Sequence, residues 1–474
     1  MSLPFPASKP LKWKYAILLI VVAAVCFNAA YTPAAPSPWG LLMVGYLIAV
    51  VQLARLPSTR QAFYAGLITG LLCCGPQLAF FWGIFGSAAA ALWTILAFWI
   101  ALFVALTHVA LIRLGTKNTV WLMPFLWTGL EYFRSELYYL KFAWLNAGFA
   151  FSGWPLLPLH TLGVYGIGFC LAAYAGLFLL FRVKHIMVGS VVGMGVLAVG
   201  YGLFSAPTGS ALSNQPKPRI AGVQLEFPII SELQQSLDNA ITAQPDVSLV
   251  VLSEYTLDGP PPQALKDWCR EHQKFLVVGG KAPADGKNYY NTAFVISTNG
   301  EVVFQQAKCV PIQFFKDGRP APEQKLWDSP WGKIGICICY DLSYSRVTDE
   351  LARQGAQMLI VPTMDVSEWG RHEHVLHARI APVRAAEYGI PIFRVASSGI
   401  SQGVDGHGEV RATAPFPGDG EVLYFATHPG RVATLPLDRW LAPGAGGITG
   451  LFIAWLGLEK LRRRSKRPAL ANAQ

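Results

Sequence analysis

Long apolar runs fill the first 206 residues, whereas beyond residue 218 short apolar stretches alternate with polar ones. Seven of the long runs reach, or nearly reach, the length that a helix needs to cross roughly 30 Å of hydrocarbon. These runs lie at about 15–31, 38–54, 62–82, 87–112, 119–133, 157–181 and 186–206. The pattern therefore predicts a membrane domain of about seven transmembrane helices over residues 1–206.

A different pattern follows a Pro-, Ser- and Gly-rich stretch at 207–218, which we interpret as a linker. Short apolar runs that are typical of buried strands alternate there with amphipathic segments that predict helices. Strands are expected at 219–224, 247–252, 275–280, 333–339, 358–362 and 392–396, with a hairpin formed by 290–296 and 301–310. This alternation predicts an α/β domain with buried sheets over residues 219–435.

The C-terminal end returns to a membrane-like pattern. An apolar run ends at Leu458, and a strongly basic stretch follows it. We expect an eighth transmembrane helix at 440–458 and a basic tail at 459–474. The alternative is an amphipathic segment that lies on the membrane surface.

The charges predict an orientation in the membrane. Only 14% of the 474 residues are charged and 53% are hydrophobic, which excludes a single soluble globule. The net charge of +10 does not indicate nucleic-acid binding, because the basic residues lie at the ends of apolar runs. Basic clusters at Lys12, Arg55, Arg113 and Lys184 occupy alternate loops, which the positive-inside rule places in the cytoplasm. Both termini are then cytoplasmic, and the α/β domain lies on the outer side.

Cys339 is the first candidate for chemistry. It ends the apolar stretch 333–339 and is followed by a turn and an expected helix at Ser345 to Gln354. The N–H groups of such a turn can lower the pKa of a thiol and bind a developing oxyanion. The eight cysteines show neither a disulfide framework nor the spacing of a metal site. A buried core cysteine is the alternative interpretation of Cys339.

Glu254 and Lys308 occupy comparable places in the predicted fold. Glu254 follows a buried strand, and Lys308 closes a strand of the hairpin. A carboxylate base, an ammonium group and a thiol together form an acyl-transfer site. The base takes the thiol proton, and the ammonium stabilises the oxyanion with help from the N–H of Tyr340. Taken singly, Glu254 can be a helix N-terminal charge and Lys308 a solvated edge residue.

The loop between the fifth and sixth expected spans is unusually rich in polar and aromatic residues. Glu131 and Arg134 are three residues apart and share a face if this part is helical. We interpret Arg134 as a ligand for a lipid phosphate and Trp144 as part of a lipid-facing entrance. The alternative is that these residues are interfacial anchors.

Three short motifs resemble those of the nitrilase, or carbon–nitrogen hydrolase, superfamily. They are Leu-Ser-Glu254-Tyr, Gln-Ala-Lys308-Cys-Val-Pro and Cys-Ile-Cys339-Tyr-Asp. Together with the membrane half, and with Glu131-x-x-Arg134 and Phe142-x-Trp144, they resemble the bacterial apolipoprotein N-acyltransferases. The resemblance implies a multi-span helical domain joined to a nitrilase-like α-β-β-α sandwich in the inner membrane, with the catalytic domain in the periplasm.

The resemblance also implies a reaction without a cofactor. Cys339 takes an acyl chain from a membrane phospholipid as a thioester and passes it to the N-terminal amine of a diacylglyceryl-cysteine lipoprotein. Phe314, Phe315 and Trp369 lie in expected loops and are candidates to hold acyl chains, although they can equally be core or rim aromatics.

Two departures from the family pattern concern carboxylates. The family has a glutamate soon after the lysine, whereas this chain has none at the matching place, and Asp317 or Glu323 are its candidate substitutes. After the cysteine, Asp341 stands where the family has glutamate, and we expect it to support the site.

Three rival functions stay open at this point. A membrane-anchored amidase would use the same residues with water as the acceptor. A transporter usually carries ionisable residues in the middle of its spans, which are nearly absent here. A metal enzyme would use His372, His374 and His377, but their spacing does not match His-Glu-x-x-His, and we expect no metal.

Overall fold

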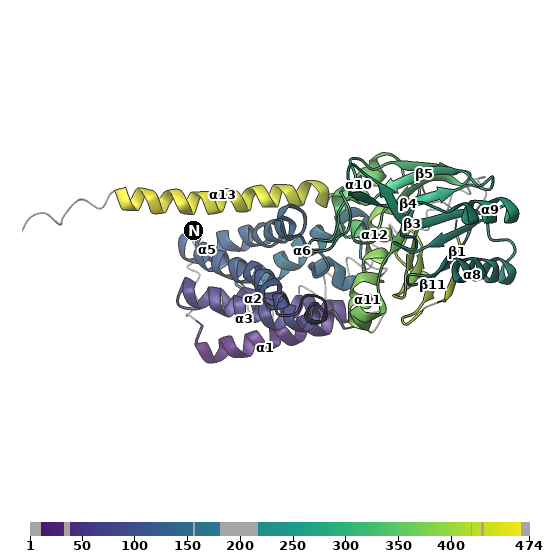
Figure 1. Ribbon diagram of the computed structural model, residues 1–474. Helices are drawn as coiled ribbons and strands as arrows, with labels where there is room; N and C mark the ends of the chain where they lie inside the picture. Colours follow the sequence, from purple (N-terminus) through teal and green to yellow (C-terminus); the bar gives the residue numbers. More distant parts are fainter. Residues whose placement is uncertain are drawn as a thin grey trace, which may run out of the picture.

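The computed structural model describes residues 11–32, 38–154, 157–180, 217–418, 420–427 and 431–465. A bundle of apolar helices forms one half of the molecule and two β-sheets with their helices form the other (Figure 1). The C-terminal helix runs back from the sheets alongside the bundle. The expected span at 186–206, most of the linker at 207–218 and the end of the basic tail lie outside the described residues.

The helical half is apolar on all sides, as expected for helices that contact both one another and lipid. Its helices are α1 (Trp13–Ala30), α2 (Leu42–Leu53), α3 (Thr59–Gln77), α4 (Phe81–Phe85), α5 (Ala88–Tyr132) and α6 (Leu159–Leu177). Within the described residues, four helices are long and apolar enough to cross a membrane, namely α1, α5 with its extension to Leu137, α6 and the C-terminal helix. The expected number of seven spans before the α/β domain stays a prediction.

The structure joins two of the expected spans. The segments 87–112 and 119–133 both fall within α5, which is interrupted at Gly115. Gly115 has φ 74° and ψ 168°, a conformation that glycine adopts without the steric cost of a Cβ atom. The basic residues Arg113 and Lys117 flank this break.

The α/β half contains two six-stranded sheets that pack face to face. One has the order β12-β1-β2-β3-β4-β5 and the other β11-β10-β9-β8-β7-β6. The strands of the first sheet are β1 (Arg219–Val223), β2 (Leu249–Leu252), β3 (Phe275–Pro283), β4 (Tyr289–Ile296), β5 (Val302–Ala307) and β12 (Val422–Ala426). Those of the second are β6 (Leu326–Ser329), β7 (Gly332–Ile336), β8 (Met358–Thr363), β9 (Ile392–Ala396), β10 (Ser401–Val404) and β11 (Val410–Ala414).

Side chains that point alternately to the two faces of each strand explain how the sheets and helices pack in layers. In β2, Leu249 and Val251 belong to the core between the sheets, whereas Val250 and Leu252 pack under the outer helices α8 (Ile230–Ala243) and α9 (Gln263–His272). The second sheet is flanked by α10 (Ser345–Arg353), α11 (Gly370–Ala378) and α12 (Ile380–Tyr388). The expected helix–sheet–sheet–helix sandwich is confirmed.

The helices of the second sheet face the membrane domain. In Figure 1, α11 and α12 lie between the sheets and the apolar helices. Side chains tie the two halves together: Ser152 Oγ donates to the carbonyl of Arg379 at 2.9 Å, and the backbone N–H of Val164 donates to Glu387 at 2.8 Å. Chemistry that occurs at this side of the sandwich is therefore next to the membrane domain.

One strand was predicted too long. The strand predicted at 333–339 is β7, which ends at Ile336, so Cys339 does not belong to the strand. Cys339 instead opens a short 3₁₀ helix, Cys339–Ser343, that precedes α10. The apolar pattern continues through Cys337 and Ile338 because both are fully buried, not because they belong to the sheet.

The C-terminal helix α13 (Asp438–Ser465) is fixed at its start by a buried network of charges. Arg439 donates to Asp349 at 2.7 Å, to Asp438 at 2.6 Å and to the Tyr388 hydroxyl at 2.8 Å. Asp438 also accepts a bond from the backbone N–H of Tyr165 at 2.9 Å. The network thereby connects α13 to α10, α12 and α6.

We expect Arg439→Met to destabilise the folded protein by about 3 kcal/mol, because it leaves buried carboxylates without their cation. Arg411→Met is the matched control, since Arg411 pairs with Asp405 and Glu409 at the surface and such pairs contribute little. Unfolding in detergent, followed by tryptophan fluorescence, measures both. An equal effect of the two substitutions would contradict an anchoring role for Arg439.

Candidate active site

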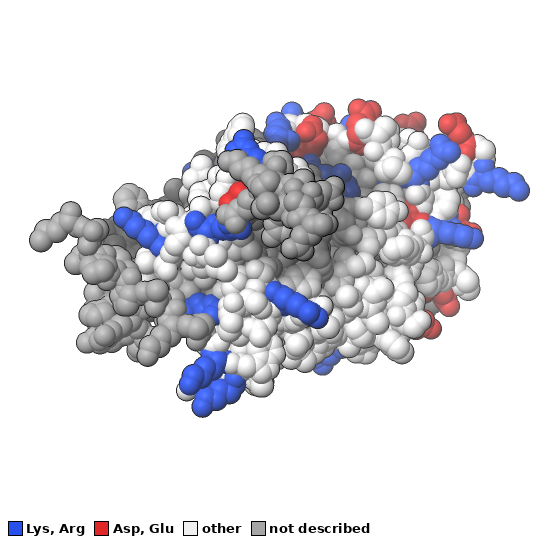
Figure 2. All heavy atoms as spheres, turned by 90° about the vertical axis from the view of Figure 1, so that its left-hand side faces the viewer, with Lys and Arg blue, Asp and Glu red and all other residues white. Residues whose placement is uncertain are grey.

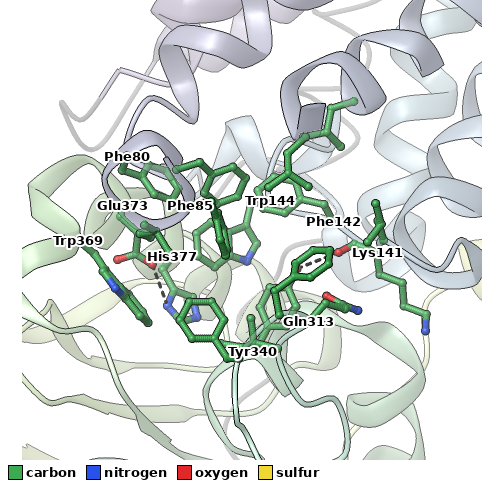
Figure 3. A pocket seen from close by; sticks show the side chains of 18 of the residues that line it. Phe80, Phe85, Lys141, Phe142, Trp144, Gln313, Tyr340, Trp369, Glu373 and His377 are labelled. Atoms are coloured by element: carbon green, nitrogen blue, oxygen red, sulfur yellow. Dashed lines mark hydrogen bonds and ion pairs between the residues drawn. The ribbon is translucent and has the colours of Figure 1, made fainter. Parts of the chain in front are cut away.

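A cavity lies between the membrane helices and the α/β domain and opens to the outside. Figure 3 shows its walls, where aromatic side chains predominate. The membrane domain contributes Phe80, Phe81, Ile84, Phe85, Leu92, Ile95, Leu96, Phe142 and Trp144. The α/β domain contributes Phe314, Phe315, Tyr340 and Trp369, and also the polar residues Cys339, Glu373 and His377. The cavity is therefore an apolar chamber with one polar end.

The thiol of Cys339 reaches this cavity from a constrained turn. Cys339 has φ 52°, a left-handed conformation that is uncommon for a residue with a Cβ atom and is typical of functional sites. Asp341 stabilises the turn, because its carboxylate accepts the N–H groups of Ile338 at 3.2 Å, Cys309 at 3.1 Å and Val310 at 2.7 Å. Burial raises the pKa of Asp341 to about 6. Asp341 thus connects the Cys339 turn to the segment that follows Lys308.

Lys308 brings two carboxylates together beneath the thiol. Its Nζ lies 2.8 Å from Glu254 Oε1 and 2.8 Å from Asp317 Oδ2, and all three side chains are buried. Asn291 donates to both carboxylates, at 2.6 Å to Glu254 and 2.8 Å to Asp317. The other oxygen of Glu254 accepts the backbone N–H of Met364 at 2.9 Å. Three segments that are distant in sequence therefore converge on one ion-paired centre.

Asp317 takes the position for which the sequence analysis offered two candidates. In addition to Lys308, it accepts the Tyr255 hydroxyl at 2.9 Å and the backbone N–H of Ile312 at 2.8 Å. Glu323 is instead exposed and pairs with Lys325 at 2.5 Å. The segment between Lys308 and Cys339 thus still delivers a carboxylate to the lysine, from a loop that folds back on itself.

The pKa values of the thiol and of the neighbouring carboxylate are both raised at this site. Burial, and then the nearby Glu254 carboxylate, raise the pKa of Cys339 well above its usual value, and Lys308 offsets this only in part. Burial also raises the pKa of Glu254 despite its pairing with Lys308. For Lys308, burial lowers the pKa, but Glu254 and Asp317 raise it by more. The net direction is thus opposite to the lowered thiol pKa that the sequence suggested.

The aromatic candidates for lipid binding all line the cavity. Phe314 is 69% exposed, and its ring contacts Phe85 with centroids 6.2 Å apart. Phe315 lies between Phe85 and Trp369, at 5.6 Å and 6.2 Å. Trp144 is buried and donates to Ser343 Oγ at 2.9 Å, which joins the membrane domain to the Cys339 turn.

Arg134 does not line the cavity that contains Cys339. It is 6% exposed, donates to Asn146 and lines a second, smaller cavity together with Glu131. The residues around that cavity come from α1, α2, α3, α5 and the segment that follows α5, which contributes Arg134 and Leu145. None of them comes from the α/β domain. The structure thus does not bring Arg134 to the cavity that contains Cys339.

Sequence reasoning missed a second polar group beside the cavity. Asp365 lies 2.7 Å from His377 Nδ1 and 2.5 Å from an Arg394 nitrogen, and Glu373 Oε2 lies 2.9 Å from His374 Nδ1. The histidines were visible in the sequence as a possible metal motif, but Asp365 follows β8 and Arg394 lies on β9. Arg394 already supplies a positive charge to Asp365, so this group contains an ion pair as well as carboxylate–imidazole contacts.

Comparisons with known proteins match both halves of the chain. Residues 15–177 match the apolipoprotein N-acyltransferase N-terminal domain, and residues 226–434 match the carbon–nitrogen hydrolases. An apolipoprotein N-acyltransferase of Geobacter metallireducens is 24% identical over 462 residues, which cover 84% of this chain and 87% of that protein. One from Shewanella oneidensis is 23% identical over 465 residues, covering 84% and 88%.

A relative without a membrane half matches less of the chain. A formamidase of Bacillus cereus is 28% identical over 154 residues, which cover 28% of this chain and 46% of the formamidase. The similarity to amidases is thus confined to part of the α/β domain, whereas the N-acyltransferases match both halves. The resemblance found in the sequence is confirmed: the chain is a multi-pass membrane protein that belongs to the family of apolipoprotein N-acyltransferases.

Proposed function

We propose that the protein transfers an acyl chain from a membrane phospholipid to the N-terminal amine of diacylglyceryl-cysteine lipoproteins, through a thioester on Cys339. The observation that carries this proposal is the position of Cys339. Its thiol lies next to Glu254 and Lys308 at the polar end of an apolar cavity that membrane helices help to form. A hydrocarbon chain fits such a cavity better than a small polar amide does.

The first half-reaction forms the thioester. Cys339 Sγ attacks the ester carbonyl of the phospholipid, and Glu254 accepts the thiol proton as the sulfur becomes nucleophilic. Lys308 stabilises the developing oxyanion by its charge, and we assign the same role to the N–H of Tyr340. Glu254 then returns the proton to the alcohol oxygen of the leaving lysophospholipid. The raised pKa of Glu254 favours this exchange, because a stronger base takes the thiol proton more readily.

The second half-reaction makes the amide. The amine of the lipoprotein attacks the thioester carbonyl, the C–S bond breaks, and Cys339 is regenerated. Asp317 does not reach the substrate in this scheme. It holds Lys308 between two carboxylates, so that the ammonium keeps its charge and its direction.

The topology we propose follows from the basic residues. Arg113, near the break in α5, pairs with Glu459 near the end of α13 at 3.2 Å, so two cytoplasmic segments predicted from charge lie together. Figure 2 views the molecule from this end, where Lys and Arg side chains are spread over the surface. In this orientation the α/β domain and Cys339 lie on the periplasmic side of the inner membrane, and both termini are cytoplasmic.

The test of the function uses purified protein in detergent, a phospholipid and a diacylglyceryl-cysteine peptide. We expect mass spectrometry of the peptide to show the gain of one acyl chain on its N-terminal amine, together with release of lysophospholipid. Release of free fatty acid at the same rate with and without the peptide would instead identify a hydrolase that uses water.

We expect the cavity to select the acyl chain by length. Ile95→Trp adds a large side chain to the cavity wall and should slow acylation by long-chain phospholipids by about tenfold, with a smaller effect on short-chain ones. Ile112→Trp is the matched control, because Ile112 is 64% exposed on the same helix and does not line the cavity. Equal rates for long and short chains in Ile95→Trp would show that the chain lies elsewhere.

A further inference from the structure

His377 lines the same cavity as Cys339 and has no part in the mechanism above. Its Nδ1 lies 2.7 Å from Asp365 Oδ1 and 3.8 Å from Glu373 Oε1. Its ring stacks on Trp144, with centroids 4.6 Å apart and planes inclined by 19°. Figure 3 shows the His377 ring and the Glu373 carboxylate pointing toward one another at the end of the cavity near Trp369. The imidazole is thus held in one orientation at the wall of the cavity that Cys339 also lines.

The second half-reaction releases a proton that Glu254 does not account for. A free α-amine has a pKa of about 7.7–8.0 and is mostly an ammonium at neutral pH. Conversion of an ammonium to an amide releases two protons. One returns to the Cys339 sulfur as the C–S bond breaks. The other has to leave before the N–C bond forms, because an ammonium nitrogen has no lone pair.

Glu254 is the group that returns a proton to the Cys339 sulfur. One of its oxygens accepts bonds from Lys308 and Asn291, and the other accepts the N–H of Met364. The same carboxylate has to restore the thiol of Cys339 at the end of the reaction. A separate base is therefore needed for the ammonium proton.

We propose that His377 is this base and accepts the proton that the acceptor's ammonium loses before it attacks the thioester. The proposal rests on the proposed acyl transfer. In the complete step the N–C bond forms, the C–S bond breaks, Cys339 regains its proton and His377 becomes an imidazolium. Asp365 stabilises that imidazolium through the 2.7 Å contact, and the proton passes to solvent after the product leaves.

The surroundings of His377 suit this role. Burial lowers the pKa of His377, and Asp365 offsets this only in part, so the imidazole is neutral and able to accept a proton at pH 7. Burial raises the pKa of Glu373 to about 7. The charged and titratable groups that act on His377 are Asp365 after β8, Glu373 on α11, Arg394 on β9 and Lys308 after β5. The ring stacked on it, Trp144, carries no charge.

The first test uses the wild-type protein. Acyl-enzyme is formed with phospholipid, freed from donor, and mixed with a diacylglyceryl-cysteine peptide in a single turnover at several pH values. With His377 as the base, the transfer rate stays level below the pKa of the amine and falls only as pH drops through the lower pKa of His377. A tenfold fall for every pH unit below about 8 would mean that only the free amine reacts, and would overturn the proposal.

The second test compares nucleophiles in His377→Gln. We expect a normal yield of acyl-enzyme and a transfer to the peptide about 100-fold slower at neutral pH. Discharge by hydroxylamine, which is already unprotonated at neutral pH, should be unaffected. His108→Gln is the control, since His108 is also buried but lies in the membrane domain, with its Nδ1 2.8 Å from the carbonyl of Ala54.

The outcomes separate the two proposals. Equal slowing with the peptide and with hydroxylamine, or no slowing with either, would overturn the role of His377 and leave the acyl transfer intact. A wild-type protein that forms no acyl-enzyme would instead overturn the proposed function. If His377→Gln does not fold, the wild-type pH profile decides alone.

Discussion

Replacement of Cys339 by alanine is expected to abolish both the acyl-enzyme and the acylated peptide, while the protein still folds and inserts. The thiol is the only sulfur that lines the cavity within the described residues, and no neighbouring side chain can form the thioester in its place. Loss of a 2% exposed thiol at the edge of a cavity removes little packing. Intact-mass analysis after incubation with phospholipid, with thermal unfolding as the check on folding, measures the effect.

Cys337→Ala is the matched control for this substitution. Cys337 lies two residues earlier, is fully buried and does not line the cavity. No substrate in the cavity can reach its thiol, so it is an inert core residue. We expect Cys337→Ala to lose some stability and to keep the acyl-enzyme. Acylation that survives in Cys339→Ala, or disappears in Cys337→Ala, would contradict the assignment of the nucleophile.

The second large effect is expected for Glu254→Gln, which should slow formation of the acyl-enzyme by about 10³-fold. The amide has the shape of the carboxylate but cannot take the thiol proton. The thiol then stays neutral, because its pKa is raised by burial. Rapid-quench measurement of acyl-enzyme formation tests this, and a rate that recovers at high pH, where the thiol ionises without help, would support the role of base.

Asp317→Asn separates the role of Glu254 as a base from the effect of its negative charge on Lys308. Both carboxylates lie 2.8 Å from Lys308 Nζ, so each substitution removes one negative charge from the same lysine. Of the two carboxylates, Glu254 is the one that raises the pKa of the Cys339 thiol. We expect Asp317→Asn to slow acylation by about tenfold, through a less well held Lys308. Equal losses in the two variants would mean that Glu254 acts only by its charge.

The sequence predicted the layers of the α/β domain and the segments that meet at its site. Glu254, Lys308 and Cys339 each follow a buried strand or turn, and the ends of neighbouring strands lie close together in a sheet sandwich. Their chemical types then suggested acyl transfer before any distance was known. The strand before Cys339 was predicted too long, because buried residues outside a sheet have the same apolar pattern as a strand.

The positions of Asp317 and Arg134 could not be predicted from the sequence. Asp317 reaches Lys308 because the loop turns through positive φ angles at Phe314 (71°) and Gly318 (78°), which spacing alone does not reveal. The sequence therefore left Asp317 and Glu323 as equal candidates. Arg134 was interpreted as a lipid ligand from its charge and position in a loop, but the hydrogen bond to Asn146 holds it inside the membrane domain. Asp365 and His377 were missed as a pair because they come from different elements.

The central claim is a thioester on Cys339 that is passed to an amine. The most direct measurement is the intact mass of the purified protein after incubation with phospholipid, followed by peptide mapping and by addition of either buffer or a diacylglyceryl-cysteine peptide. We predict a gain of one acyl chain on the peptide that contains Cys339, which is stable in buffer and is lost when the acceptor peptide is added. An adduct that disappears equally fast in buffer, or that maps to another residue, would contradict the account.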